Sequence, residues 1–118
     1  MKLKQSRWAS KAGLDDFRDK VIEASKKQPV VVDFWADWCS PCHAIAPHIG
    51  RAIDQLNGEV LLVKVEVDEG ENMKLAGRYA LRGFPTIMLF NQGEEVAHFA
   101  GSRATHWISQ WLAEHIHS

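Results

Sequence analysis

The sequence has few cysteines, almost no net charge and no long hydrophobic run, and each of these absences excludes a class of protein. Only two of its 118 residues are cysteine, which excludes the disulfide framework of small secreted domains. The 14 basic and 15 acidic residues are interspersed and give a net charge of -1, which argues against a nucleic-acid groove or a polybasic membrane surface. No apolar run approaches the roughly 20 residues that a membrane-spanning helix needs. We therefore expect partners that are neither nucleic acids nor membranes.

The length and the hydrophobic content fit one domain. A chain of 118 residues that is 46% hydrophobic can bury a sizeable core without disulfides. The basic first residues, M-K-L-K-Q-S-R-W-A-S, are not followed by the apolar segment of about 7 to 15 residues that marks a secretory signal. We therefore expect residues 1–118 to form a single domain that works in the cytoplasm. We also expect this domain to be a monomer.

Hydrophobic patterns predict strands that alternate with helices and then a hairpin, which is typical of an α/β layered domain. The sheet should be partly parallel, with an antiparallel hairpin around Asn91-Gln92-Gly93. The expected elements are a helix carrying Leu14, Phe17, Val21 and Ala24, a strand from Val30 to Trp35, a helix from the cysteines to Asn57-Gly58, a strand over Val60 to Val67, a short helix over Asn72 to Tyr79, strands over Thr86 to Phe90 and Glu94 to Phe99, and a last helix over Ala104 to His115.

Both cysteines lie where an apolar strand runs into a helix. The strand V-V-V-D-F-W is followed by W-C-S-P-C, whose proline stands where a helix would begin. The first turn of a helix has unpaired N–H groups and the positive end of the macrodipole, so it favours a thiolate. Cys39, at the mouth of this turn, is expected to attack disulfides, and Cys42 is close enough to form an internal disulfide and release the captured partner. The pattern therefore predicts dithiol exchange.

Asp33 interrupts the apolar strand six residues before Cys39. Burying a carboxylate is costly, so such a group usually shifts its pKa or finds a partner. Lys64, in the next apolar strand, is the cation that could reach it. The alternative is a residue at the end of the strand that faces water. We expect burial to outweigh Lys64 and to raise the pKa of Asp33.

Three separated motifs resemble the thioredoxin family. They are D-F-W-A-D-W-C-S-P-C, from Asp33 to Cys42, R-G-F-P-T, from Arg82 to Thr86, and N-Q-G-E before the last helix. The resemblance covers almost the whole chain and implies the thioredoxin fold, a central mixed β-sheet flanked by helices on both faces. It also implies a protein-disulfide reductase with no cofactor other than the redox-active disulfide Cys39–Cys42. Its partners would be disulfide-containing proteins and an electron donor like thioredoxin reductase.

The resemblance also assigns roles to other residues. The Asp33–Lys64 pair would handle the proton of Cys42, with Asp33 as general base. A cis proline in the R-G-F-P-T loop would face the cysteines and expose backbone groups to an extended substrate strand. Substrate contacts are expected from Trp38, Ser40, Pro41, Phe84, Pro85 and Gly101.

Ser40 and His43 depart from the commonest pattern of the family, in which glycine and a basic residue are frequent at these positions. A histidine changes charge near neutral pH, so His43 could alter the redox poise, or it could face solvent and be inert. C-S-P-C-H also matches the haem attachment pattern, and Cys39, Cys42, His43 and His48 have the elements of a zinc site. A core this small lacks a haem pocket, and one helix cannot wrap four ligands around an ion. We therefore expect no metal.

Two other functions remain open at this point. A disulfide oxidase or isomerase would need an oxidising compartment. A client-binding or chaperone-like module would use the surface around Trp38 and Pro85 without chemistry, although the intact cysteines argue against it.

Overall fold

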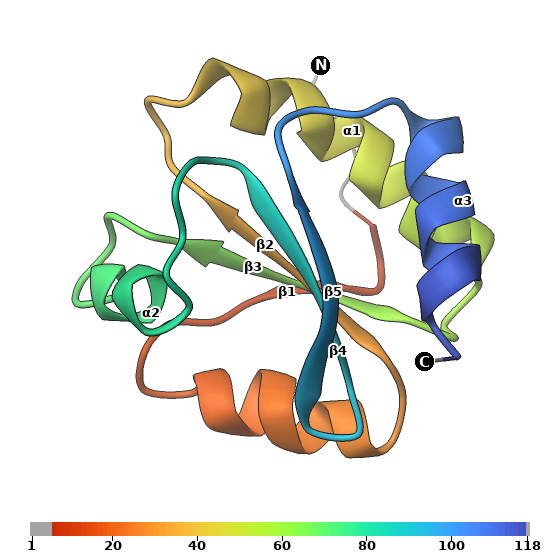
Figure 1. Cartoon of the computed structure of the whole chain (residues 1–118), viewed down its shortest axis with the longest axis horizontal. Coiled ribbons are helices and arrows are strands. Elements are labelled where there is room, and N and C mark those ends of the chain that lie inside the picture. The colour runs from red at the N-terminus through yellow and green to blue at the C-terminus, as the bar shows by residue number, and fades with distance from the viewer. Residues whose placement is uncertain (1–5, 118) are drawn as a thin grey trace.

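The computed structural model describes residues 6–117. Its helical and extended elements follow the predicted order, with one additional strand near the start (Figure 1). The elements are β1 (Ala9–Lys11), η1 (Arg18–Glu23), η2 (Ala24–Lys26), β2 (Val30–Trp35), α1 (Ser40–Gln55), β3 (Leu61–Glu66), α2 (Met73–Arg78), β4 (Thr86–Asn91), β5 (Glu94–Ala100) and α3 (Thr105–His115).

The strands form one mixed sheet in the order β1-β3-β2-β4-β5. β1, β3 and β2 run parallel, because η1 and α1 provide the crossovers that parallel neighbours need. β4 pairs antiparallel with both β2 and β5. The expected mixed sheet and its antiparallel hairpin are thereby confirmed.

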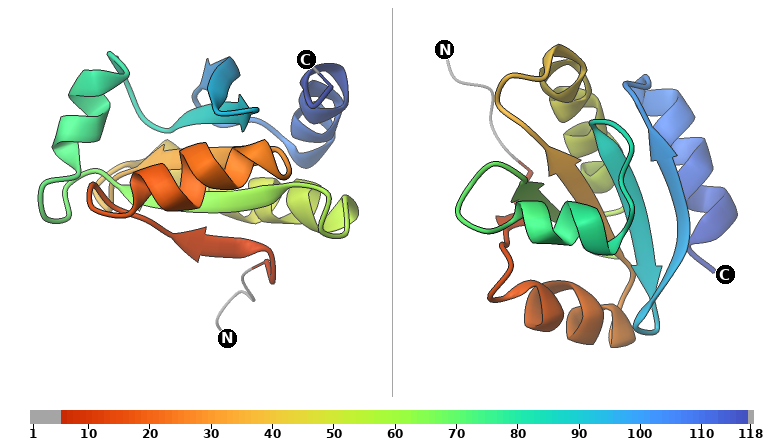
Figure 2. Two further views of the ribbon diagram at one scale, coloured as in Figure 1. Left: turned by 90° about the horizontal axis from the view of Figure 1, so that it is seen from below. Right: turned by 60° about the vertical axis from the view of Figure 1, so that its left-hand side comes forward.

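Both faces of the sheet are buried, since neighbouring residues of each strand point to opposite sides. On β2, Val30, Val32 and Phe34 belong to one core cluster, and Val31 belongs to the other. The first cluster lies under η1 and α2, and the second under α1 and α3 (Figures 1 and 2). This confirms the α/β fold with helices on both faces.

Two elements differ from the expectation. β1 was not predicted, because Ala9-Ser10-Lys11 lacks an apolar pattern and becomes a strand through its parallel pairing with β3 at the edge of the sheet (Figure 2). The first helix begins at Arg18 rather than at Leu14, and it is a π-helix continued by a 3-10 turn. The segment before it is held as a turn, since Asn72 Oδ1 accepts the N–H of Leu14 and Asp16 Oδ1 accepts the N–H of Gly13.

Candidate active site

Three connections meet at one edge of the sheet. β2 ends at Trp35 and leads into α1, whereas its antiparallel neighbour β4 begins at Thr86, opposite Phe34. β5 ends at Ala100, which in turn lies opposite Thr86. The turn with the cysteines, the loop before β4 and the loop after β5 are therefore brought together by the register of the sheet.

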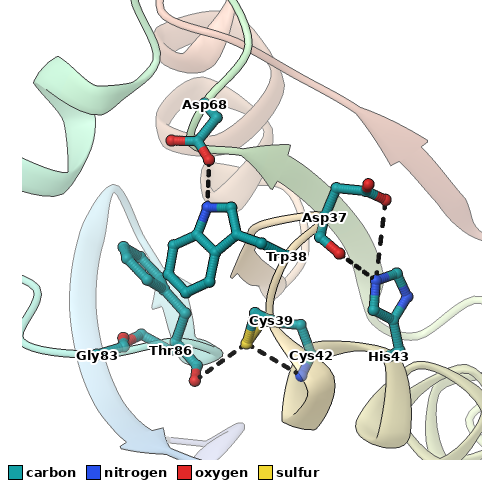
Figure 3. The surroundings of a disulfide bond; sticks show 9 residues. Asp37, Trp38, Cys39, Cys42, His43, Asp68, Gly83 and Thr86 are labelled. Atoms are coloured by element: carbon teal, nitrogen blue, oxygen red, sulfur yellow. Dashed lines mark hydrogen bonds and ion pairs between the residues drawn. A yellow bond between two sulfur atoms is a disulfide. The ribbon is translucent and has the colours of Figure 1, made fainter.

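The two cysteines form a disulfide at the start of α1, with their Cα atoms 5.3 Å apart. Cys39 is the N-cap of α1, and its Sγ accepts the backbone N–H of Cys42 at 3.3 Å (Figure 3). Ser40 and Pro41 occupy the exposed first turn. A thiolate on Cys39 would gain from this hydrogen bond and from the positive end of the helix.

The loop before β4 lies against Cys39. The Phe84–Pro85 peptide bond is cis, as expected. The Phe84 carbonyl oxygen is 3.4 Å from Cys39 Sγ. Pro85 itself is buried, and its carbonyl oxygen accepts the N–H of Gly101 at 2.9 Å, where Gly101 has a φ of 85°. Gly101 thus lies beside the proline loop, and part of the expected free backbone of that loop is already paired.

Trp38 is the large exposed apolar side chain of this site, with 68% of its surface accessible. Its indole N–H donates to Asp68 (Figure 3). Its ring meets the Phe84 ring edge to face, with the ring centroids 6.2 Å apart. Sequence reasoning missed Asp68. The available signal was its position directly after the apolar run of β3, because the carboxyl ends of the parallel strands β2 and β3 meet at the same edge.

Asp33 is buried on the face of the sheet covered by α1, with 1% of its surface accessible. Its register partner on β3 is Lys64. Within residues 6–117, Asp33 Oδ1 has no hydrogen-bond partner. Burial raises the pKa of Asp33 from 3.8 to about 6, and the positive charge of Lys64 opposes this rise. The alternative of a water-facing Asp33 is wrong, whereas proton transfer between Asp33 and Cys42 stays a prediction.

His43 is exposed but contacts the turn that carries Cys39. Its Nε2 is 2.7 Å from the main-chain oxygen of Asp37, and its ring lies at 77° to the Trp35 indole. His48 instead pairs with Thr105 on α3 through Nδ1, at 2.8 Å. Across the described part of the chain, no three His, Cys, Asp or Glu side chains are grouped to hold a metal ion.

The two sulfurs differ in their hydrogen bonds more than in their exposure. Because Cys39 lies at the open end of the turn, the sequence predicts that it is the more exposed of the two cysteines. Cys39 is 4% and Cys42 2% accessible, so the difference in exposure is small. After reduction, iodoacetamide at mildly acidic pH is expected to modify Cys39 first, because its thiolate retains the bond from the Cys42 N–H. Peptide mass spectrometry at partial modification measures the order. Earlier modification of Cys42 would reverse the assigned roles.

A paired Cys-x-x-Cys at a helix N-terminus, beside a cis-proline loop and an exposed tryptophan, defines a thiol–disulfide oxidoreductase. The family model described as thioredoxin matches residues 10–114. The chain is 37% identical over 100 residues to thioredoxin 1 of Nostoc sp., covering 85% of this chain and 90% of that protein. It is 34% identical over 101 residues to thioredoxin of Chlorobaculum thiosulfatiphilum, covering 86% and 90%.

A third relative is the probable thioredoxin-2 of Caenorhabditis elegans, 40% identical over 88 residues, which are 75% of this chain and 58% of that protein. The chain belongs to the thioredoxin family. It is an enzyme of the thioredoxin type, a protein-disulfide reductase. None of the helices described between residues 6 and 117 combines the length and the apolar character required to cross a bilayer.

Proposed function

We propose that residues 1–118 act as a monomeric, single-domain carrier of electrons to disulfide-containing proteins in the cytoplasm, where it would contribute to redox homeostasis. A reductase like thioredoxin reductase returns the electrons. The observation that carries this proposal is the Cys42 N–H bond to Cys39 Sγ at the start of α1, which favours a thiolate on the attacking cysteine. No cofactor beyond the Cys39–Cys42 disulfide takes part.

The reaction has two exchange steps. The Cys39 thiolate attacks one sulfur of the substrate disulfide, and the other substrate sulfur leaves as a thiolate. Cys42 then loses its proton and attacks Cys39 Sγ, which breaks the mixed disulfide and releases the second substrate thiolate. The substrate gains two electrons, and Cys39 and Cys42 lose two and end as a disulfide. The reductase restores the dithiol.

Asp33 is the proposed acceptor of the Cys42 proton. Its raised pKa makes it a stronger base than an ordinary carboxylate while it is still ionised near neutral pH. Lys64, opposite Asp33 in the register of the sheet, stabilises the ionised form and so limits that rise. The pair would therefore let one carboxyl group alternate between its two forms during turnover.

The proposed docking surface for protein substrates surrounds Cys39. Trp38 and Phe84 provide a contiguous aromatic contact, and the exposed Ser40 and Pro41 border it on α1. The loops of Pro85 and Gly101, joined by their hydrogen bond, form the opposite border. An extended substrate segment would lie between these borders, with its disulfide over Cys39.

The proposed reduction is tested with insulin. We expect catalytic amounts of the protein to accelerate insulin reduction by dithiothreitol, and NADPH with a thioredoxin reductase to replace dithiothreitol as the electron source. Precipitation of the free insulin B chain gives the rate in the first assay, and NADPH consumption gives it in the second. A Cys39→Ser, Cys42→Ser double variant is the matched control. Equal rates for this variant and the native protein would contradict the proposal.

A further inference from the structure

We propose that His43 is a positioning residue for dithiol exchange, which holds the turn from Asp37 to Cys39 in place for the docking of protein substrates. The proposal rests on the proposed reduction of protein disulfides and adds to it a residue that does not touch the reacting sulfurs. His43 lies in the first turns of α1, one residue after Cys42. From there its side chain reaches back over the turn between β2 and α1 (Figure 3).

The contact between His43 and Asp37 has a defined direction. Nε2 is 2.7 Å from the main-chain oxygen of Asp37, and a carbonyl oxygen can only accept a hydrogen bond. Nε2 therefore carries a proton and donates it. The imidazole also packs against Trp35 in a T-shaped arrangement, with ring centroids 6.0 Å apart. One side chain thus joins the end of β2, the turn and the start of α1.

The turn is held from its other side by Asp68. Asp68 accepts the indole N–H of Trp38, the residue between Asp37 and Cys39. The N–H of Cys39 closes the turn by donating to the oxygen of Ala36 at 3.1 Å. Without the His43 donor, the carbonyl of Asp37 would bind water instead, and the turn that carries the exposed Trp38 would lose one of the hydrogen bonds that hold it. Binding of a protein substrate should weaken, whereas the Cys42 N–H bond to Cys39 would persist.

The proposed role does not depend on the charge of His43. Both the neutral ring protonated at Nε2 and the imidazolium donate to the Asp37 oxygen. One charged group lies close to the ring, because Asp37 Oδ1 is 3.8 Å from Nε2. Lys64, Arg51 and Asp54 line a cavity of about 320 Å³ together with His43. If His43 acted through its charge, its effect on substrate docking would change with pH as the ring and these groups gain or lose protons. An effect through the hydrogen bond would not change with pH.

Two variants distinguish the effect of the His43 hydrogen bond from the effects of its aromatic ring and of its charge. His43→Phe keeps the aromatic contact with Trp35 and removes the donor. His43→Gln places an uncharged N–H donor the same number of bonds from the backbone as Nε2. His98→Phe is the matched control, since His98 is an exposed histidine on β5 that pairs with Glu95 outside the site.

For His43→Phe we expect KM for insulin to rise roughly fivefold, as the loss of one hydrogen bond would produce, with kcat within about twofold of the native value. Reduction of the small disulfide DTNB should stay within about twofold, because it needs no docking surface. His43→Gln should match the native protein at pH 5.5 and at pH 8, and His98→Phe should match it throughout. In the oxidised protein without substrate, amide hydrogen exchange at Trp38 and Cys39 should accelerate in His43→Phe only.

Three results would overturn the proposal: an unchanged KM and unchanged exchange in His43→Phe, the same defect in His43→Gln as in His43→Phe, or equal losses with insulin and DTNB. The exchange measurement keeps the two proposals apart. If the native protein fails to reduce insulin, the proposed function is wrong, while exchange at Trp38 and Cys39 still decides whether His43 holds the turn.

Discussion

Cys42→Ser is expected to abolish multiple turnover while leaving the capture of a substrate intact. Serine at this position keeps the backbone N–H that Cys39 Sγ accepts, so the attacking thiolate retains its stabilisation. A serine oxygen cannot form a disulfide with Cys39, and the mixed disulfide therefore persists. Steady-state reduction of insulin should fall by roughly a hundredfold or more, because the two cysteines act as a unit. Mass spectrometry of the intact protein should show one covalent substrate adduct per chain.

Cys39→Ser is the matched variant for this experiment. It removes the attacking sulfur, so both turnover and adduct formation should be lost. Both sulfurs are buried in the disulfide form, and each substitution replaces sulfur by a smaller oxygen at a comparable place in the core. A stable adduct in Cys39→Ser but none in Cys42→Ser would mean that Cys42 attacks the substrate and Cys39 resolves the mixed disulfide.

Most of the sheet could be predicted because its central strands are apolar on both faces. β2, β3 and β4 each bury residues on either side, and this leaves a nearly continuous hydrophobic run in the sequence. β1 could not be predicted, since Ala9-Ser10-Lys11 has no such run and owes its extended form to β3. The predicted start of the first helix was wrong because Leu14 has helical spacing with Phe17 and Val21. In the structure, however, the N–H of Leu14 donates to Asn72, which is 58 residues away in sequence.

The same distinction applies to the site. Cys39, Cys42 and Trp38 are adjacent in sequence, so their relation could be predicted from local chemistry. The anchor of Trp38 on Asp68 and the bond between Gly101 and Pro85 depend on how distant loops approach each other. Such contacts between distant loops cannot be predicted from local sequence patterns. The burial of Asp33 could be predicted because it depends on local sequence alone. Its neighbours in the strand are apolar and buried, so the carboxylate between them is buried too.

Asp33→Asn is expected to stabilise the folded protein at neutral pH. The pKa of Asp33 is about 6 in the folded chain and near 3.8 when unfolded, so the unfolded chain loses this proton first as pH rises. Native stability therefore falls between about pH 4 and pH 6, and the difference in pKa corresponds to roughly 3 kcal/mol. Asparagine does not titrate. Above pH 6, the free energy of unfolding of the variant should exceed that of the native protein by up to that amount, less the cost of burying the amide. Below pH 4, where Asp33 is protonated in both states, the loss of its titration should make no difference to stability.

Asp16→Asn is the control, because it should change the stability at neutral pH in the opposite direction. The N–H of Gly13 and then the charge of Lys20 lower the pKa of Asp16, so its contribution is present above pH 4 and is lost as pH falls through the folded pKa. This variant should be slightly less stable at neutral pH. Urea unfolding of the oxidised forms from pH 3 to pH 8 measures both effects.

The same Asp33→Asn variant is expected to slow the second exchange step, because Cys42 loses its proton acceptor while Cys39 keeps its hydrogen bond. Stopped-flow measurement should show capture of a disulfide substrate nearly unchanged and release from the mixed disulfide slowed by roughly ten- to a hundredfold near neutral pH. The defect should shrink at alkaline pH, where Cys42 ionises without assistance. Unchanged turnover combined with lost stability would mean that Asp33 serves only as a structural partner of Lys64.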